Sequence, residues 1–335
     1  MFAPSTPILV AGHRGMVGSA IVRCLQREGF HALILHTRAQ TDLCNAAAVD
    51  HLFATTRPAL VFLAAARVGG ILANDTFPAD FIRENLLIQT HVIQSAHQHK
   101  ARRVLFLGSS CIYPRDAPNP IRESALLSGP LEATNRAYAL AKIAGIEMCW
   151  SYNRQYPRES TRYVAAMPTN LYGPGDNYHP TQSHVIPGLI RRFHEAKLAA
   201  HKEVVVWGSG APRREFMHAD DMAKACVQLM MLDEQRWQAL TASDRNHGEA
   251  PLVNVGTGSD LRIAELATLI ARVVGFPGQI RFDPSKPDGT MRKLMSSDKL
   301  HALVGQTARP LEEGLAQAYA DFLGLAAAST LPVPG

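Results

Sequence analysis

The sequence has few of the features that mark exported, membrane-embedded or disulfide-stabilised proteins. Its 335 residues contain only five cysteines, an odd number without any C-x-x-C pair, so we expect neither a disulfide framework nor a zinc site. No apolar run approaches the roughly 18 residues that a membrane-spanning helix needs, and the first residues show no basic leader or cleavage site for export. We therefore expect a soluble, cytoplasmic protein that binds no metal and no membrane.

Basic residues exceed acidic residues only slightly, by 34 to 29, and they are scattered along the chain. Surfaces that bind nucleic acid carry clustered basic residues, so this pattern argues against nucleic acid as a partner. Arginine outnumbers lysine by 26 to 8. Because the guanidinium fork suits paired contacts with phosphate or carboxylate, this excess favours a polyanionic small ligand, although a genome rich in arginine codons would give the same count.

Short apolar runs alternate with helical patterns through the first half of the chain, and the length suits two modest domains. Such alternation predicts βαβ units and a parallel sheet flanked by helices, so we expect an α/β fold. The expected strands are residues 8–11, 33–35, 60–64, 104–107 and 163–167, and the expected helices are residues 16–28, 46–55, 78–99 and 138–156. The last two helices are long, and their apolar stripes suit packing on the sheet or pairing across a dimer.

The pattern changes after Asn170, where proline and glycine interrupt the chain. From there we expect a helix at 185–197, a strand at 203–207, a helix at 220–232, a strand at 252–255 and a helix at 263–274. We expect a first domain made of residues 1–175 and about 214–258, and a smaller α/β domain made of about 176–213 and 259–325. Residues 326–335 are expected to form a loose tail.

A glycine-rich loop follows the first expected strand and opens the first expected helix. Its seven residues, with G-x-x-G-x-x-G spacing, are Gly12, His13, Arg14, Gly15, Met16, Val17 and Gly18. Glycines at this spacing let the backbone turn tightly and approach a pyrophosphate, which would lie at the helix N-terminus. A merely structural turn is the alternative, but the strand before the loop and the helix after it favour a Rossmann-type, doubly wound dinucleotide-binding domain.

The residues after the second expected strand bear on the choice between NAD and NADP. An NAD-binding chain usually has an acidic residue here for the ribose 2′-hydroxyl, whereas this chain has His36-Thr37-Arg38. Arg38, helped by Arg14, would pair with a 2′-phosphate, so we predict NADP(H); a simply solvated Arg38 is the alternative. Asp42 and Leu43 are candidates for contacts with the adenine, and Asp42 would alternatively cap a helix.

Tyr138 and Lys142 stand four residues apart in an expected helix and therefore lie on one face of it. The fourth expected strand runs into Gly108 and Ser109, which places a hydroxyl at the carboxyl end of a strand, where open α/β sheets bind ligands. Reduction of a ketone needs a proton donor, for which Tyr138 is the candidate. Free tyrosine has a pKa near 10, and we expect the Lys142 ammonium to lower that pKa. Ser109 would hydrogen-bond the carbonyl oxygen.

The loop, the Ser109 strand and the Tyr-x-x-x-Lys helix resemble the extended short-chain dehydrogenase/reductase family of nucleotide-sugar enzymes. The likeness runs from about residue 8 to about residue 323. The segments that carry it are residues 11–20, 108–114, 167–174, 183–187, 206–210 and 285–290. The resemblance implies NADPH-dependent 3,5-epimerisation and then 4-keto reduction of GDP-4-keto-6-deoxy-D-mannose to GDP-L-fucose, by a homodimer that pairs two long helices of each subunit.

The resemblance also implies roles for individual residues. For catalysis these are Ser109, Tyr138 and Lys142 in reduction, with Cys111 and His184 in epimerisation. Further cofactor contacts are implied for Leu107, Gly108, Ser110, Pro168, Thr169, Asn170, Leu171 and His184, besides the glycine loop, Arg38, Ser109, Tyr138 and Lys142. Contacts with the GDP-sugar are implied for Arg192, Trp207, Arg214, Lys286 and Asp288. Guanine rests on the resemblance alone, because these basic side chains would hold the diphosphate of any nucleotide.

The chemistry of a 4-keto sugar supports two separate titratable groups. The ketone acidifies the hydrogens on C3 and C5, so each centre is inverted when one group removes a proton and another returns one to the opposite face. A thiolate at Cys111 would be stabilised near Lys142, and His184 titrates near neutrality. We assign Cys111 as the base and His184 as the acid, although these residues leave the direction open. Otherwise Cys111 is a buried small residue and His184 a loop histidine.

Four alternatives are considered at the level of sequence. A 4,6-dehydratase carries an acidic pair just after its active-site hydroxyl, where this chain has Cys111-Ile112. A 4-epimerase would retain NAD and usually an acidic ribose clamp, against which Arg38 argues. Another nucleotide-sugar epimerase or reductase of the same family, and a non-catalytic NADP-binding scaffold, are the other readings.

Overall fold

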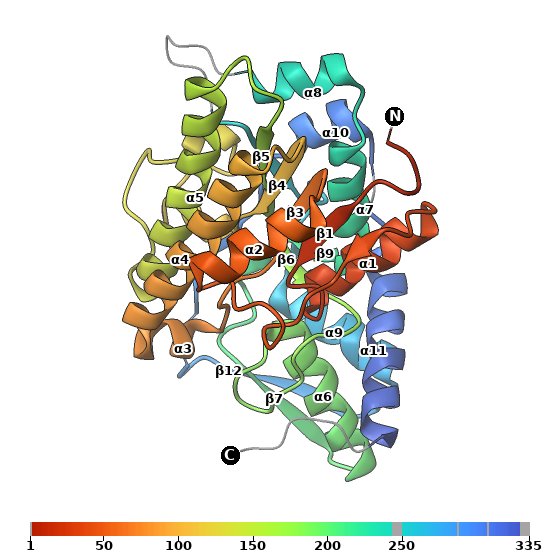
Figure 1. The fold of residues 1–335 in the computed structure, drawn as a ribbon. Coiled ribbons are helices and arrows are strands. Elements are labelled where there is room, and N and C mark those ends of the chain that lie inside the picture. The colour runs from red at the N-terminus through yellow and green to blue at the C-terminus, as the bar shows by residue number, and fades with distance from the viewer. Residues whose placement is uncertain (1, 243–249, 287, 307, 329–335) are drawn as a thin grey trace.

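A six-stranded parallel sheet forms the centre of the larger part of the molecule (Figure 1). Its strand order is β10-β5-β4-β3-β1-β2. The computed structural model describes residues 2–242, 250–286, 288–306 and 308–328. The six strands are β1 (Ile8–Ala11), β2 (Leu33–Ile34), β3 (Leu60–Leu63), β4 (Arg103–Leu107), β5 (Arg162–Pro168) and β10 (Leu252–Val255). Each lies where the sequence predicts a strand, and the expected parallel α/β sheet is confirmed.

Helices cover both faces of this sheet. Successive strand residues point to opposite faces: Ile8 and Val10 of β1 belong to one apolar core, and Leu9 and Ala11 belong to another. The first core includes α1 (Met16–Arg27) and α7 (Ala219–Met230), and the second includes α2 (Ala46–Thr56), α4 (Pro78–Gln98) and α5 (Arg136–Gln155). Because both faces are buried, apolar residues predominate in the strands and do not alternate with polar ones.

The order of the strands places a crevice beside β1. This strand lies between β2 and β3 and pairs with both in parallel. The chain therefore leaves β1 toward one edge of the sheet and later returns to the other side of β1 for β3. Loops at the carboxyl ends of strands diverge at such a switch point, and ligands of open α/β sheets bind there.

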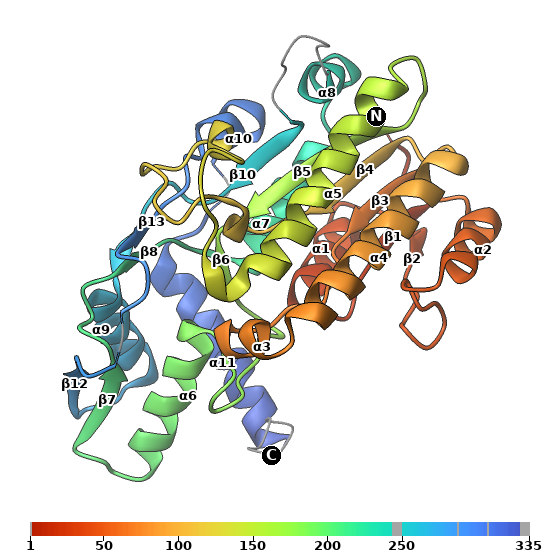
Figure 2. The ribbon, with the colours of Figure 1, turned by 90° about the vertical axis from the view of Figure 1, so that its left-hand side faces the viewer.

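The smaller part of the molecule lies beyond the carboxyl ends of these strands and has an apolar core of its own (Figure 2). In it, β7 (Glu203–Trp207) pairs in parallel with β12 (Gln279–Asp283). Its helices are α6 (Val185–Leu198), α9 (Ile263–Val274) and α11 (Leu311–Ala327). The sequence predicts α6, β7 and α9 but neither β12 nor α11. The exact division into two domains stays a prediction.

The remaining elements are short. The short strands are β6 (Asn170–Tyr172), β8 (Arg213–Arg214), β9 (Phe216–His218), β11 (Leu261–Arg262) and β13 (Arg292–Lys293). The short helices are α3 (Ile71–Thr76), α8 (Glu234–Thr241), α10 (Asp298–Val304), η1 (Ser110–Ile112), η2 (Glu123–Ala125) and η3 (Ala133–Asn135). Glu215, which is fully buried between β8 and β9, accepts N–H groups of Thr257, Gly258 and Met295. This carboxylate holds segments of both parts together.

The last described helix, α11, continues through Ala327, so the chain is helical at the first two residues of the expected loose tail. Residues 329–335 of that tail lie outside the described residues. Among the described residues, no helix is both long and apolar enough to cross a membrane. Within the same ranges, no group of three or more His, Cys, Asp or Glu side chains is arranged to hold a metal ion.

Candidate active site and cofactor cavity

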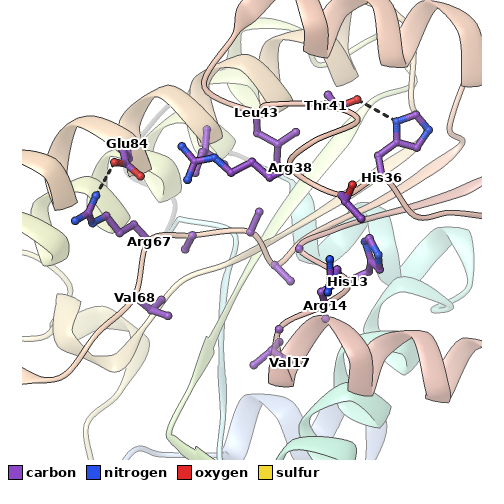
Figure 3. Close-up of a pocket in the computed structure, with 18 of the residues that line it drawn as sticks. His13, Arg14, Val17, His36, Arg38, Thr41, Leu43, Arg67, Val68 and Glu84 are labelled. Carbon is purple, nitrogen blue, oxygen red and sulfur yellow. Dashed lines mark hydrogen bonds and ion pairs between the residues drawn. The ribbon is translucent and has the colours of Figure 1, made fainter. Parts of the chain in front are cut away.

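A cavity of about 670 Å³ opens at the switch point, between the loops that follow β1, β2 and β3 (Figure 3). All seven residues of the glycine loop line it, as do Arg38, Asp42 and Leu43. The loop after β3 contributes the small side chains of Ala64, Ala65 and Ala66. The structure thus brings the residues expected at the adenosine half of a dinucleotide to one cavity.

The three glycines of the loop differ in how much space a Cβ atom would have at each position. Gly12 has φ +86°, and a Cβ there would lie 2.7 Å from the backbone nitrogen of Ala65. A Cβ at Gly18 would overlap the carbonyl oxygen of Gly12. A Cβ at Gly15 would meet only that oxygen, at 3.6 Å. Gly12 and Gly18 are therefore required by the packing of the fold, whereas Gly15 leaves space on the cavity side of the loop.

The N-terminus of α1 suits an anion. Its N-cap residue, Gly15, provides no side-chain cap, and the first turn contains no acidic residue. Free N–H groups at a helix N-terminus, together with the helix dipole, favour phosphate. The space at Gly15, the uncapped helix and the arginines nearby fit a dinucleotide pyrophosphate, so the residues present are suited to the expected cofactor.

Arg38 is available to bind a ligand. Its side chain is 76% exposed, and its Nε lies 3.9 Å from the Asp42 carboxylate, a loose pair. Asp42 accepts the N–H of Cys44 at 3.0 Å. The N-cap of α2 is Asn45, whose side chain accepts the N–H of Ala48. The alternative of Asp42 as the helix cap is therefore wrong, and Asp42 instead shapes the loop that carries Arg38.

The predicted catalytic residues lie together where β4 ends. Ser109 precedes η1, and its Oγ accepts the N–H of Cys111 at 3.4 Å. Lys142 is buried on α5, and its Nζ donates to the Leu107 carbonyl at 2.7 Å. The same Nζ lies 5.7 Å from the centre of the Tyr138 ring, as the spacing along the helix predicts. A hydroxyl, a phenol and an ammonium from two distant segments thus converge beside a thiol.

Burial sets the protonation of this cluster. Burial raises the pKa of Tyr138, the nearby Cys111 raises it further, and Ser109 lowers it. Burial also lowers the pKa of Lys142 to about 8. The expectation that Lys142 brings the pKa of Tyr138 down toward neutrality is wrong for this structure, because burial sets the direction and Lys142 is not among the groups that shift this pKa. Tyr138 consequently keeps its proton at neutral pH.

Cys111 is buried near the same groups and near a lysine that sequence reasoning missed. Burial raises the pKa of the thiol, while Ser109, Lys293 and Lys142 lower it. Lys293 lies on β13, and the charges of Cys111 and Arg214 both affect its pKa. It therefore stands between the catalytic cluster and the basic groups of the smaller part. The only feature of the sequence that could have indicated Lys293 is its position shortly after residues 285–290, which carry part of the family resemblance.

The remaining cofactor residues occupy the carboxyl end of the neighbouring strand. Pro168 ends β5, which pairs in parallel with β4, so residues 168–171 lie beside Leu107, Gly108, Ser109 and Ser110. The side chains of Thr169 and Asn170 both donate to the backbone oxygen of Glu215, at 3.2 and 2.9 Å. Leu171 follows on β6. These contacts hold the segment that the resemblance places against the nicotinamide half.

His184 is the N-cap residue of α6, and burial lowers its pKa. Its carbonyl oxygen accepts the N–H of Gly188 at 3.0 Å. Within the described ranges, no hydrogen bond or ion pair joins the His184 imidazole to Cys111 or Tyr138. The structure positions His184 through its helix, and its role in epimerisation stays a prediction.

The expected substrate residues gather around Trp207 in the smaller part. Trp207 is 65% exposed at the end of β7, and the charged ends of Arg192 and Lys286 each lie 5.8 Å from its ring centre. Burial lowers the pKa of Arg214, and the nearby Asp288 raises it. Asp288 accepts the backbone N–H and the hydroxyl of Ser209, at 2.9 and 2.6 Å. Its carboxylate therefore also holds the loop after β7.

Comparison with known proteins agrees with this geometry. The sequence model of the NAD dependent epimerase/dehydratase family matches residues 8–238. The chain belongs to this family. It is 54% identical over 316 residues to GDP-L-fucose synthase of Escherichia coli, covering 94% of this chain and 96% of the relative. It is 53% identical over 319 residues to GDP-L-fucose synthase 1 of Arabidopsis thaliana, covering 95% and 94%.

A solved member of similar architecture is a GDP-mannoheptose C4 reductase from Campylobacter jejuni with NADP bound. It has a TM-score of 0.85 and 35% identity, and the match covers 96% of this chain and 100% of that chain. The family match contains the whole cofactor cavity and the catalytic cluster, whereas Lys286, Asp288 and Lys293 lie beyond its last matched residue. The family match therefore includes the residues of the cavity and of the catalytic cluster. The residues expected to bind the nucleotide sugar beyond residue 238 are covered only by the relatives that match nearly the whole chain.

Proposed function

We propose that this protein converts GDP-4-keto-6-deoxy-D-mannose to GDP-L-fucose, by epimerisation at C3 and C5 followed by NADPH-dependent reduction of the C4 ketone. The observation that carries the proposal is the convergence of Ser109, Tyr138 and Lys142 with Cys111 at the end of β4. High identity to two GDP-L-fucose synthases over nearly the whole chain supports the choice of substrate.

NADPH, when bound, supplies the hydride that reaches C4. For its adenosine half, Arg38 and Arg14 would pair with the 2′-phosphate, and the loop at Gly15 would face the pyrophosphate. For its nicotinamide half, the Lys142 ammonium would hold the ribose, and residues 107–110 and 168–171 with His184 would enclose the ring. The exposed, loosely paired Arg38 supports NADP over NAD.

In the reduction, Tyr138 donates its phenolic proton to the C4 oxygen. The raised pKa of Tyr138 keeps that proton in place until the oxygen becomes strongly basic. The Ser109 hydroxyl, which hydrogen-bonds the side chains of Tyr138 and Cys111 before substrate binds, would donate to the same oxygen. The phenolate that results is stabilised by Lys142, whose pKa of about 8 leaves the ammonium largely charged at neutral pH.

In the epimerisation, Cys111 removes the proton from C3 and from C5, and His184 returns a proton to the opposite face through an enolate. Burial raises the pKa of the Cys111 thiol, and the Ser109 hydroxyl, Lys293 and Lys142 oppose that rise by favouring the thiolate. After each inversion the proton taken up by the thiol returns to the imidazole through solvent. The two lysines and Ser109 thus lower the cost of forming the thiolate that the epimerisation requires.

For the nucleotide, Trp207 would stack on the base, and Arg192, Arg214 and Lys286 would contact the diphosphate. Asp288 would keep the loop after β7 in place beside them. We further propose a cytoplasmic homodimer in which α4 and α5 of two subunits pair. Sedimentation of the purified protein tests the dimer.

A second candidate is a reductase that does not epimerise, because the solved GDP-mannoheptose C4 reductase has 35% identity. The buried Cys111 between two lysines favours the bifunctional enzyme. The test is to supply a panel of nucleotide sugars with NADPH and to determine the product configuration by NMR. Absence of substrate-dependent NADPH oxidation would exclude both candidates and favour a non-catalytic scaffold. A product with unchanged C3 and C5 would exclude the epimerase.

A further inference from the structure

Two histidines stand on the wall of the cofactor cavity next to Arg38, and the mechanism above uses neither imidazole. His13 belongs to the loop after β1, and His36 is the first polar residue after β2 (Figure 3). The charge of His36 contributes to lowering the pKa of His13, so the two rings are near one another. Two imidazoles from separate loops therefore line the side of the cavity that the loop after β2 forms, from which Arg38 also extends (Figure 3).

Each imidazole has a ring nitrogen without a hydrogen-bond partner among the described residues. Nδ1 of His36 lies 3.0 Å from the hydroxyl of Thr41, which leaves its Nε2 without a hydrogen bond in the described ranges. Nδ1 of His13 is buried and has no hydrogen-bond partner among the residues that the structure describes. A buried nitrogen without a partner is costly, and a bound anion would satisfy it if the ring carried a proton there.

The charged groups around these rings are mostly basic. Arg14 comes from the loop of His13, and Arg38 and Asp42 come from the loop of His36. Across the cavity, Glu84 is paired with Arg67 at 2.6 Å. Burial, Arg14 and His36 all lower the pKa of His13, so without an anion its ring is neutral at pH 7. A phosphate with almost two negative charges would reverse that balance and favour the imidazolium.

We infer that His13 and His36 make the binding of NADP proton-coupled, so that NADP binds with uptake of a proton and NAD does not. This inference rests on the proposed function, in which the 2′-phosphate lies beside Arg14 and Arg38. Linkage then requires the affinity for NADP to fall as the pH rises, by up to about tenfold per pH unit for one whole proton. The preference for NADP over NAD falls as the pH rises, because the affinity for NAD, whose 2′-hydroxyl carries no charge, does not depend on this proton.

Calorimetric titration with NADP⁺ and NAD⁺ measures this directly without catalysis. Titrations at pH 7.5 in buffers of different ionisation enthalpy give the number of protons taken up, and affinities at pH 7.0 and 8.5 give the slope. The 2′-phosphate has its own pKa near 6, so above pH 7 an uptake belongs to the protein. We expect a substantial fraction of a proton for NADP⁺, close to none for NAD⁺, and a several-fold loss of NADP⁺ affinity by pH 8.5.

Substitutions of the two histidines show which side chain takes up the proton when NADP⁺ binds. His36→Gln and His13→Gln should each reduce the uptake and flatten the pH dependence, whereas Arg38→Ala should weaken NADP⁺ binding and keep the uptake. His31→Gln is the matched control, because His31 is exposed at the other end of β2 and lies outside the cavity lining. The inference would be overturned, and the proposed cofactor would stand, if the protein preferred NADP⁺ over NAD⁺ without taking up a proton. The same would follow if the uptake were unchanged in a protein with both His13→Gln and His36→Gln. NAD⁺ preferred at every pH would overturn the proposed cofactor as well.

Discussion

Replacing Gly15 by alanine should abolish tight cofactor binding without harming the fold. Gly15 has φ −76° and ψ 163°, which any residue adopts, and its new Cβ would meet only the Gly12 oxygen at 3.6 Å. Alanine restricts the unfolded chain and stabilises by about 0.4–1 kcal/mol, but it is a poorer N-cap than glycine by a similar amount. The two effects oppose each other, so we expect the free energy of unfolding to stay within about 0.5 kcal/mol.

The same methyl group would occupy the space that a pyrophosphate needs in order to approach the loop. A displacement that costs about 1.4 kcal/mol of binding energy weakens affinity tenfold, and we expect at least that loss for NADPH. Denaturant titration gives the stability, and quenching or enhancement of NADPH fluorescence gives the dissociation constant. Wild-type affinity in a stable Gly15→Ala protein would refute the placement of the pyrophosphate at this loop.

Two other glycines provide controls for this experiment. Gly29 has φ +87°, and a Cβ there would meet nothing within 4 Å, so Gly29→Ala should cost about 1–2 kcal/mol of stability from the backbone alone and leave NADPH binding intact. Gly12 combines φ +86° with a 2.7 Å approach to Ala65. Gly12→Ala should therefore lose more stability than Gly29→Ala.

Three further changes test the electrostatics of the site and of the fold. Arg38→Ala should reduce the preference for NADPH over NADH by roughly 5–30-fold, since an exposed charge-assisted bond contributes about 1–2 kcal/mol; equal preference in wild type and variant, from parallel binding titrations, would contradict the role of Arg38. Lys293→Met should slow alkylation of Cys111 by iodoacetamide at pH 8 several-fold, because Lys293 lowers the pKa of that thiol. Mass spectrometry of the Cys111 peptide measures the rate, and an unchanged rate would count against an effect of Lys293 on Cys111. Asp176→Asn should stabilise the protein by about 1–3 kcal/mol at pH 8 and by much less at pH 4.5. Burial raises the pKa of Asp176 to about 7, so the wild type binds a proton there that the unfolded chain lacks and loses stability as the pH rises from about 4 to 7. Denaturant titrations at the two pH values check this, and an equal gain at both would refute it.

Local patterns were enough to predict the sheet and the centre of the site. Fully buried parallel strands have continuous apolar runs, and the glycine loop stands where a strand meets a helix. Tyr138 and Lys142 were paired by helical spacing alone, and the structure places the ammonium 5.7 Å from the ring centre. These features depend on residues that are close together in the chain, so they could be predicted from the sequence.

Features that depend on tertiary packing were not predictable in the same way. β13 has two residues, and its place is set by pairing with β8, so nothing local indicates that Lys293 approaches Cys111. The direction of the pKa shift of Tyr138 follows from burial, which spacing along a helix does not reveal. Asn45 and Asp42 are both plausible caps by residue type, and the start of α2 at Ala46, where the sequence already predicts it, makes Asn45 the cap.

The central claim is that one site contains separate groups for proton exchange and for hydride transfer. Deuterium incorporation from D₂O at C3 and C5, measured by NMR beside NADPH oxidation, tests it in Cys111→Ser and Tyr138→Phe. We predict that Cys111→Ser loses the exchange while Tyr138→Phe exchanges deuterium but oxidises NADPH at least about a hundredfold more slowly. Equal loss of both activities in the two variants would contradict the account.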